Sequence, residues 1–513
     1  MPWVIAIDAG TTGVRAFTVD EGGRPGPVAY REFTQHFPQP GWVEHDADEI
    51  WTVTLTVLAE AMDALAALGN GGGDSAVAAI GITDQRETVV AWDARDGRPR
   101  HRAIVWQDRR TAARCDGLAA AGHLDMVRSR TGLVLDPYFS ASKMEWLLTE
   151  GGVAADEHLR LGTIDSWLLW NLTGGAVHAT DVSNASRTML LDIRTLEWSD
   201  ELCGLFGVPR HALARVMPSC GEFGRTTADC PAGSGVPVAG IAGDQQSSLF
   251  GQACLTAGMA KNTYGTGSFV LMNVGDTCPE PTEGMLTTVA WQVPTRVLHP
   301  GPGATGSTTH YALEGAIFST GSAVQWLRDG LGVIDDAAEC GPLAESVTDT
   351  DGVVIVPAFT GLGSPWWDPY ARGTVVGITR GTTRAHLARA VVESMVYQTR
   401  DVVDAMVAAS AETVSELRVD GGAAAMDVML QLQADQLGVT VARSAVAETT
   451  ALGAAYLAGL GAGVWADAAE VSSAWAADRR FEPGGDRAQL DADHERWHRA
   501  VARSRHWVTA ATA

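Results

Sequence analysis

The sequence contains very little lysine. Of its 513 residues, 37 are lysine or arginine, and only two of these are lysines, Lys143 and Lys261. A phosphate-binding loop of the Gly-Lys-Ser/Thr type needs a lysine directly after a glycine, but Lys143 follows Ser142 and Lys261 follows Ala260. The sequence therefore excludes that class of nucleotide-binding protein.

Positive charge as a whole is also scarce. The 61 acidic residues outnumber the 37 basic ones, and the formal net charge is −24. Because like charges repel, we expect no nucleic-acid partner and no general affinity for anionic membranes. The first residues, Met-Pro-Trp-Val-Ile-Ala-Ile-Asp, include no basic region, so we expect no signal peptide.

Cysteines are few and scattered. The seven cysteines form no Cys-x-x-Cys pair, which favours free thiols in a reducing compartment over a disulfide framework or a zinc ribbon. We therefore expect a cytoplasmic protein. One long uncharged stretch, residues 449–466, contains ten glycines and alanines among its eighteen residues. This composition predicts a buried, closely packed helix, and we expect no insertion into a membrane.

Two segments of the sequence share one local design. In each, an apolar run leads into a tip of glycine and threonine and then into a second apolar run. The first tip is Asp8-Ala9-Gly10-Thr11-Thr12-Gly13, and the second is Tyr264-Gly265-Thr266-Gly267-Ser268. Each pattern predicts a β-hairpin.

Helical periodicity alternates with these strands. Apolar residues recur at helical spacing over about residues 383–406, and a shorter helical stretch covers residues 428–437. Strands mixed with such helices predict an α/β protein. The repeated hairpin indicates two similarly built domains, which we place at residues 1–252 and 253–513.

The first tip carries groups that suit a phosphate. Successive backbone N–H groups in such a turn form a concave anion site, and Thr11 and Thr12 add hydroxyl donors. Asp8 can hold a divalent cation, and Arg15 can reach a phosphate oxygen. With Thr266 in the second tip, two such loops would clamp a nucleoside polyphosphate. The alternative for either tip is an ordinary hairpin turn.

Polar residues after other apolar runs suit a hydroxylated substrate. Asp244 follows an apolar run and a glycine, which places it at the carboxyl end of a strand, where it can accept a hydroxyl proton. Arg86 and Glu87 offer donors and acceptors to a polyol, and Trp106 offers an apolar wall. The alternatives are a helix N-cap for Asp244, a solvated surface for the Arg-Glu pair and a core position for the tryptophan.

Two further patterns match known motifs only superficially. Gly301-Pro302-Gly303-Ala304-Thr305-Gly306 has the spacing of a dinucleotide-binding loop, but Leu-His-Pro precedes it in place of an apolar strand. His494-Glu495-Arg496-Trp497-His498 matches the zinc-peptidase pattern, with both histidines on one helix face. Its acidic start and basic end are typical of an ordinary surface helix, so we favour that interpretation.

Longer segments carry family signatures. Tyr138-Phe-Ser140-Ala-Ser-Lys143-Met-Glu-Trp146-Leu-Leu-Thr-Glu150 resembles the first signature of the FGGY carbohydrate kinases, and Gly373-Thr-Val-Val-Gly377-Ile, with Ala390-Val-Val-Glu393, resembles the second. The resemblance runs from about residue 4 to 507 and is closest to the family members that phosphorylate glycerol. Segments typical of those members are Gly41-Trp-Val-Glu-His-Asp46, Gly81-Ile-Thr-Asp-Gln-Arg-Glu-Thr88, Ala103-Ile-Val-Trp-Gln-Asp-Arg-Arg110, Leu135-Asp-Pro-Tyr138, Gly243-Asp-Gln-Gln246, Gln325-Trp-Leu-Arg328, Pro357-Ala-Phe-Thr-Gly-Leu-Gly363 and Glu448-Thr-Thr-Ala-Leu-Gly453.

The resemblance implies an actin-like, ribonuclease H-like fold with two domains around a catalytic cleft. It also implies transfer of the γ-phosphoryl group of ATP to a terminal hydroxyl of glycerol, with Mg²⁺, to give sn-glycerol 3-phosphate and ADP. Dimers or tetramers are usual in the family, which implies a homo-oligomer. Two alternatives stay open: a kinase of another small polyol or ketose, and an actin-like ATPase without a sugar substrate.

The resemblance assigns roles position by position. The expected glycerol contacts are Arg86, Glu87, Trp106, Tyr138, Asp244, Gln245 and Phe269. The expected nucleotide contacts are Thr11, Thr12, Gly13, Arg15, Thr266, Gly321, Gln325, Gly422 and Met426. Asp244 matches the catalytic base of the family, and Asp8 and Asp244 are the expected ligands of the metal ion.

Three departures from the family pattern bear on nucleotide binding. The first loop of the family often reads Asp-Gln-Gly-Thr-Thr-Ser-Ser-Arg, but here Ala9 replaces the glutamine and Gly13-Val14 replace the serines. Met426-Asp427 stand where the family usually carries two asparagines. A hydroxyl and an amide near the nucleotide are therefore missing, and we predict weaker ATP binding or looser nucleotide choice.

Overall fold

The computed structural model describes residues 2–68, 77–410 and 412–508. Two mixed β-sheets form its centre. The first sheet has six strands, which in spatial order are β14 (Cys220–Arg225), β15 (Pro237–Gly243), β6 (Val77–Asp84), β1 (Trp3–Ala9), β2 (Gly13–Asp20) and β3 (Pro25–Glu32). The second has seven, which are β18 (Leu286–Pro294), β19 (Ser307–Ile317), β17 (Ser268–Asn273), β16 (Met259–Tyr264), β22 (Glu416–Asp420), β23 (Thr440–Ser444) and β24 (Ala477–Phe481).

Both sheets repeat one arrangement around a hairpin. In the first, β1 pairs antiparallel with β2 and parallel with β6, which in turn pairs parallel with β15. In the second, β16 pairs antiparallel with β17 and parallel with β22, which pairs parallel with β23. The two predicted hairpins are thus confirmed, and they occupy equivalent places in two similar sheets.

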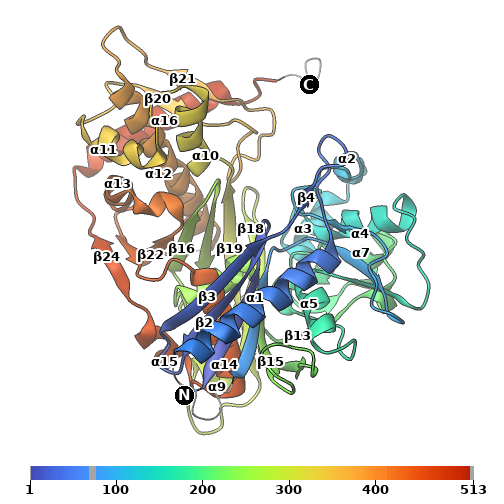
Figure 1. Cartoon of the computed structure of the whole chain (residues 1–513). Helices are drawn as coiled ribbons and strands as arrows, with labels where there is room; N and C mark the ends of the chain where they lie inside the picture. The colour runs from blue at the N-terminus through green and yellow to red at the C-terminus, as the bar shows by residue number, and fades with distance from the viewer. Residues whose placement is uncertain (1, 69–76, 411, 509–513) are drawn as a thin grey trace.

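Helices cover the outer faces of the sheets. On the first sheet α1 (Ala47–Ala67) packs against β2 and β3, and α5 (Ile164–Leu172) packs against β6 and β15. On the second sheet α12 (Arg384–Ser410) packs against β17 and β19, and it confirms the predicted long helix. Around α12 gather α10 (Gly321–Gln325), α11 (Cys340–Glu345), α13 (Asp427–Leu437) and α16 (Arg487–Ser504) (Figure 1).

The space between the sheets is filled by α8 (Asp244–Gly251) and α14 (Thr449–Ala462). The uncharged helix predicted for this stretch is confirmed as buried, because α14 packs against β1, β6, β15 and α8. Its backbone comes so close that a Cβ at Gly81 would overlap the Ala454 carbonyl, and one at Gly240 would overlap the Ala458 amide. The small side chains of α14 thus allow a helix to lie directly on the first sheet.

The remaining elements form a lobe beside the first sheet, the small β20–β21 sheet against α12 and α16, and short connecting segments. The helices are α2 (Ala112–Ala120), α3 (Leu124–Thr131), α4 (Ser140–Thr149), α6 (Val182–Ala185), α7 (Asp200–Leu205), α9 (Thr295–Leu298) and α15 (Ala468–Ala474). The strands are β4 (Gln35–His36), β5 (Glu44–His45), β7 (Val90–Asp93), β8 (Ala103–Ile104), β9 (Leu159–Gly162), β10 (Ala179–Asp181), β11 (Leu191–Asp192), β12 (Glu197–Trp198), β13 (Arg215–Met217), β20 (Val354–Val356) and β21 (Thr374–Val376).

One helix in the described part of the chain is long and apolar enough to cross a membrane by length and composition. It is α1, and 33% of its most apolar window is buried in the protein. Its buried side chains include Ile50, Val57, Leu58 and Ala61, which pack in the same core as the first sheet. Packing on the sheet therefore accounts for the apolar face of α1.

Candidate active site

Three parallel strands of the first sheet end at one edge, and each carries a polar group there. Asp8 lies near the end of β1, Arg86 and Glu87 follow β6, and Asp244 follows β15. Because the carboxyl ends of parallel strands meet at the same edge, these residues come together although they are far apart in sequence. Arg86 Nε lies 3.0 Å from Asp244 Oδ1, and the Asp244 side chain is 31% exposed.

The hairpin of β1 and β2 places Arg15 directly opposite Asp8. Arg15 Nη1 donates to Asp8 Oδ2 at 3.0 Å and lies 2.6 Å from Glu448 Oε2. Burial raises the pKa of Asp8 to about 6, the negative charges of Asp244 and Glu448 act in the same direction, and Arg15 opposes them. The expected phosphate-binding arginine is therefore held between two carboxylates, and acidic groups exceed basic ones at this end of the sheet.

The first loop is held by side chains of neighbouring segments. The Thr11 hydroxyl accepts a hydrogen bond of 2.9 Å from the Trp106 indole, and the Thr11 carbonyl accepts one of 3.0 Å from Gln35. The Gln85 side-chain amide donates to the Gly10 carbonyl at 3.1 Å. His45 lies between the two glutamines, and burial lowers its pKa to about 4. These bonds join the expected phosphate loop to the expected wall of the acceptor site.

Glu87 has a backbone conformation that is rare outside glycine, with φ of 64°. The Ser140 hydroxyl donates to its carbonyl at 3.1 Å, and Arg187 Nε donates to its carboxylate at 2.7 Å. Burial raises the pKa of the Glu87 carboxyl. Nearby, the Tyr138 ring meets the Trp106 ring edge-on at 5.6 Å between centroids. The structure thus brings Arg86, Glu87 and Asp244 at the edge of the first sheet together with Trp106 and Tyr138 from the neighbouring lobe.

Gln245 and Phe269 join the same group from α8 and β17. The Arg86 guanidinium carbon lies 5.9 Å from the centre of the Phe269 ring. Gln245 is buried, and its Oε1 accepts a hydrogen bond of 2.5 Å from Lys261 Nζ. The second sheet therefore contributes one wall to the group that the first sheet begins.

The second loop, Tyr264 to Ser268, rests against the start of α10. Its carbonyls at Gly265 and Thr266 accept backbone hydrogen bonds of 3.0 Å from Gly321 and Ser322. A Cβ at Gly321 would lie 2.6 Å from the Gly265 carbonyl oxygen, so only glycine fits at this contact. Thr266 itself is exposed. Gly321 thus has a structural reason of its own to be glycine.

Three expected nucleotide contacts lie at the end of α10 and in the turn before α13. Gln325 and Gly422 are exposed, and a Cβ at Gly422 would meet nothing within 4 Å. Met426 precedes α13 and packs beside Gly341 of α11. In residues 2–68, 77–410 and 412–508, no hydrogen bond or ion pair joins these three residues to the first loop. The structure thus places Gln325 and Gly422 on open surface and Met426 in the packing between α11 and α13.

The sequence matches one family over both halves. Residues 3–251 match the N-terminal domain of the FGGY family of carbohydrate kinases, and residues 260–462 match its C-terminal domain. The chain belongs to this family. It is 52% identical over 512 residues to "Glycerol kinase" of Bordetella parapertussis, covering 98% of this chain and 97% of that one. It is 51% identical to "Glycerol kinase 2" of Thermotoga maritima, covering 99% of each.

A solved structure has the same fold. The glycerol kinase of Plasmodium falciparum with ADP superposes with a TM-score of 0.91 at 34% identity, covering 98% of each chain. A ligand-bound xylulose kinase from Lactobacillus acidophilus shares the fold, with a TM-score of 0.85 at 19% identity. The two-domain α/β fold expected from the sequence is that of FGGY kinases.

Two buried residues of this FGGY kinase were missed in the sequence. Glu314 of β19 accepts from Arg86 Nη1 at 2.5 Å and Nη2 at 3.2 Å, and from Arg187 Nη2 at 2.9 Å. All three side chains are at most 2% exposed, and the two guanidinium groups lower the pKa of Glu314 against the effect of burial. A lone glutamate within the apolar strand 311–317 signals a buried ion pair, but it does not name the partners.

Both lysines of the chain are fully buried and bond to expected acceptor residues or to their backbone. Lys143 Nζ donates to the carbonyls of Pro137, Tyr138 and Phe139 at 2.9, 2.7 and 2.7 Å. Lys261 Nζ donates to Gln245, as described, and to Thr263 Oγ1 at 3.0 Å. Burial lowers the pKa of each lysine to about 8. Their rarity could have drawn attention to them, but their partners could not be read from the sequence.

The structure explains one departure in the first loop. A Cβ at Gly13 would lie 2.5 Å from the Arg31 carbonyl oxygen and 2.7 Å from the Tyr30 hydroxyl, so a serine does not fit there. The Tyr30 hydroxyl lies 3.4 Å from Thr12 Oγ1, and the Arg15 guanidinium carbon lies 5.3 Å from the centre of the Tyr30 ring. A tyrosine hydroxyl therefore occupies the place where the family pattern has a serine.

Three other features of the sequence are now placed. Asp427 forms ion pairs with Arg443, at 2.8 Å, and with Arg479. Residues 301–306 lie between α9 and β19, so a strand follows them where a dinucleotide-binding loop needs a helix. The surface-helix interpretation of the zinc-peptidase pattern is wrong about the acidic start, because α16 begins at Arg487 and has no acidic residue in its first turn; the helix also buries the face that carries His494, which is 6% exposed.

Proposed function

We propose that this FGGY kinase is an ATP-dependent glycerol kinase that transfers the γ-phosphoryl group to a terminal hydroxyl and gives sn-glycerol 3-phosphate and ADP. The observation that carries the proposal is the convergence of Arg86, Trp106, Tyr138 and Asp244 beside the first phosphate loop. Arginine and carboxylate groups can bond the hydroxyls of a triol, while the aromatic rings cover its carbon chain. Relatives at 51–52% identity that are named glycerol kinase support the same choice.

In this proposal Asp244 is the general base. Arg86 Nε and the backbone N–H of Gln245 both lie against its Oδ1, at 3.0 and 2.7 Å, and they fix the orientation of the carboxylate. Its other oxygen, Oδ2, would then accept the proton of the attacking hydroxyl. Removing one hydrogen bond to a substrate hydroxyl should cost about 1–3 kcal/mol, which lets such a site reject alcohols that lack it.

The residues present suit the expected magnesium ion. Asp8 and Asp244 offer hard carboxylate oxygens, which Mg²⁺ prefers. Negative charge from Asp244 and Glu448 adds to burial in raising the pKa of Asp8, so a divalent cation would relieve an excess of acidic groups. A bound magnesium ion would supply charge neutralisation to the phosphates. The chain's own part is to hold Arg15 beside Asp8 and to keep the first loop fixed through Thr11.

We also assign the expected nucleotide contacts to the two loops, α10 and the start of α13. Tyr30 joins them in this proposal, because its hydroxyl lies beside Thr12 at the tip of the first loop. We retain a cytoplasmic homo-oligomer, with domains at residues 1–252 and 253–513, as predictions. Light scattering after gel filtration measures the oligomeric state.

The deciding experiment measures ADP release with glycerol, dihydroxyacetone, tetritols, xylulose and no acceptor. Glycerol kinase predicts turnover that depends on glycerol and is lost in Asp244→Asn. Turnover with a ketose alone would select another FGGY kinase reaction. Turnover that needs no acceptor would select an ATPase and overturn the proposal.

A further inference from the structure

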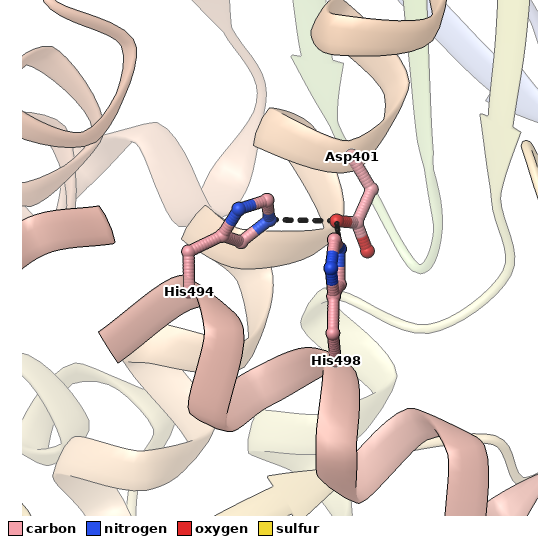
Figure 2. A group of neighbouring side chains, drawn as sticks. All are labelled: Asp401, His494 and His498. Carbon is pink, nitrogen blue, oxygen red and sulfur yellow. Dashed lines mark hydrogen bonds and ion pairs between the residues drawn. The ribbon is translucent and has the colours of Figure 1, made fainter. Parts of the chain in front are cut away.

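A group of three ligand-type side chains lies away from the site described above, between α12 and α16. His494 and His498 are one helical turn apart on α16, and both point toward Asp401 on α12 (Figure 2). His494 Nε2 and His498 Nε2 each lie 2.7 Å from the same atom, Asp401 Oδ1. The three ligand atoms all lie within 4.8 Å of one another.

The surroundings of the group fix these side chains in place. The other carboxylate oxygen, Asp401 Oδ2, accepts hydrogen bonds from the indoles of Trp497 at 2.8 Å and Trp366 at 3.4 Å. The two imidazole rings lie 4.3 Å apart between centroids, and Trp366 meets His498 edge-on at 5.7 Å. The indoles thus orient one oxygen of Asp401 and leave the other to the two histidines, as outer hydrogen bonds do around metal ligands.

We propose that Asp401, His494 and His498 bind one first-row divalent transition-metal ion, with Zn²⁺ as the best match. Two imidazole nitrogens and one carboxylate oxygen form a donor set that suits zinc and its neighbours, whereas Mg²⁺ and Ca²⁺ prefer oxygen ligands. The ion would lie between the three atoms, with Nε2 of each histidine as ligand and the ring proton on Nδ1.

The geometry needs only a small adjustment. Ligands about 2.0–2.1 Å from a tetrahedral ion lie roughly 3.3 Å apart, so the present separations of 2.7 Å must open by roughly half an ångström. The His498 side chain is 46% exposed, which gives an ion a path from solvent and leaves a position for water. Asp401 and His494 are 2% and 7% exposed, so their charge and donor atoms are shielded from bulk water.

Such an ion would join α16 to α12, which lies on the outer face of the second sheet. Its expected effect is on stability, since none of the three residues belongs to the proposed active site. The alternative is a clamp made only of protons, in which both histidines simply hydrogen-bond to Asp401. The two differ in whether the folded protein takes up one metal ion.

The experiment uses full-length protein freed of metal with a chelator and then held in excess Mg²⁺, which occupies oxygen-only sites. Co²⁺ is added as the probe, and its visible ligand-field absorption is followed to saturation. We expect one Co²⁺ per chain, displacement by Zn²⁺, and a higher melting temperature with Zn²⁺. His498→Gln and His494→Gln should each weaken Co²⁺ binding at least tenfold, while His158→Gln, at a half-buried histidine beside Glu157, should not.

Folding of each variant is checked by circular dichroism and by ATP-dependent turnover. Turnover serves as a control because none of the three residues belongs to the proposed active site. A folded wild-type chain that gives no ligand-field absorption would overturn the proposal and select the proton clamp. Equal binding by wild type and a folded His498→Gln variant would also overturn it, because the ion would then be held elsewhere.

Discussion

Replacing Glu314 with glutamine tests how Arg86 is held at the edge of the first sheet that carries the proposed active site. The Glu314 carboxylate bonds two guanidinium groups, those of Arg86 and Arg187, and no part of its side chain is exposed. Glutamine keeps the volume, but it removes the negative charge and turns an N–H toward an arginine. Breaking a buried ion pair by removing one partner costs about 3–5 kcal/mol. We expect Glu314→Gln to lower the free energy of unfolding by about 3 kcal/mol.

The same substitution should slow the reaction. Once Glu314 no longer neutralises it, Arg86 is left with Asp244 as its strongest acidic partner, at 3.0 Å. If Asp244 is the base, as proposed, a closer cation makes it accept a proton less readily, and kcat should fall by roughly tenfold or more. Urea unfolding followed by tryptophan fluorescence and a coupled assay of ADP release measure the two effects.

Glu416→Gln is the matched control for the stability effect. Glu416 lies in β22 of the second sheet, the sheet that also contains Glu314. It bonds two arginines, Arg418 at 2.7 Å and Arg480, but its side chain is 16% exposed. Ion pairs near the surface contribute about 0–1 kcal/mol. A Glu314→Gln variant no less stable than Glu416→Gln, with unchanged kcat, would refute the view that Glu314 holds Arg86 in place.

Three other predictions concern Tyr30, Asp84 and the two lysines. Tyr30→Phe should raise the KM for ATP by about tenfold, because it removes the proposed hydrogen bond to phosphate. Tyr370→Phe, at an exposed residue, should leave KM unchanged. Equal KM values for the two variants would remove Tyr30 from the proposed site. Burial and the Asp165 charge raise the pKa of Asp84 well above 3.8, so the folded chain binds a proton that the unfolded chain releases, and stability falls as pH rises above about 4. Asp84→Asn should therefore raise the melting temperature more at pH 8 than at pH 5, and a constant difference would contradict this. Acetic anhydride should leave both buried lysines unmodified until urea unfolds the chain, as mass spectrometry of the peptides would show.

Local patterns were enough to predict much of the fold. The hairpins around Asp8 and Thr266 were predicted because strand, turn and strand are adjacent in sequence. The burial of α14 is predictable because this uncharged stretch is rich in glycine and alanine, whose small side chains let a helix pack closely on its neighbours. The position of Asp244 at a strand end is also predictable, because a short apolar run directly precedes it. Each of these inferences needs only neighbours in the chain.

Contacts between distant segments were not predictable in this way. Arg86 and Glu314 are 228 positions apart, and nothing in the sequence around either one names the other. The histidines of α16 show the same limit. Helical spacing predicted that they share a face, but only the packing of α16 on α12 brings that face to Asp401. A charge pattern read along one helix therefore missed the partner that decides its burial.

The two lysines show why residue type at such positions is not interchangeable. Lys143 Nζ has three protons and meets three carbonyl oxygens, those of Pro137, Tyr138 and Phe139. A guanidinium group is planar and larger, so it cannot point three donors at one cluster of carbonyls from the same buried position. A chain that uses arginine almost everywhere else thus has lysine where a compact cation must fit. Since this ammonium group fixes the backbone of Tyr138, the scarcity of lysine in the sequence leads directly to the proposed acceptor site.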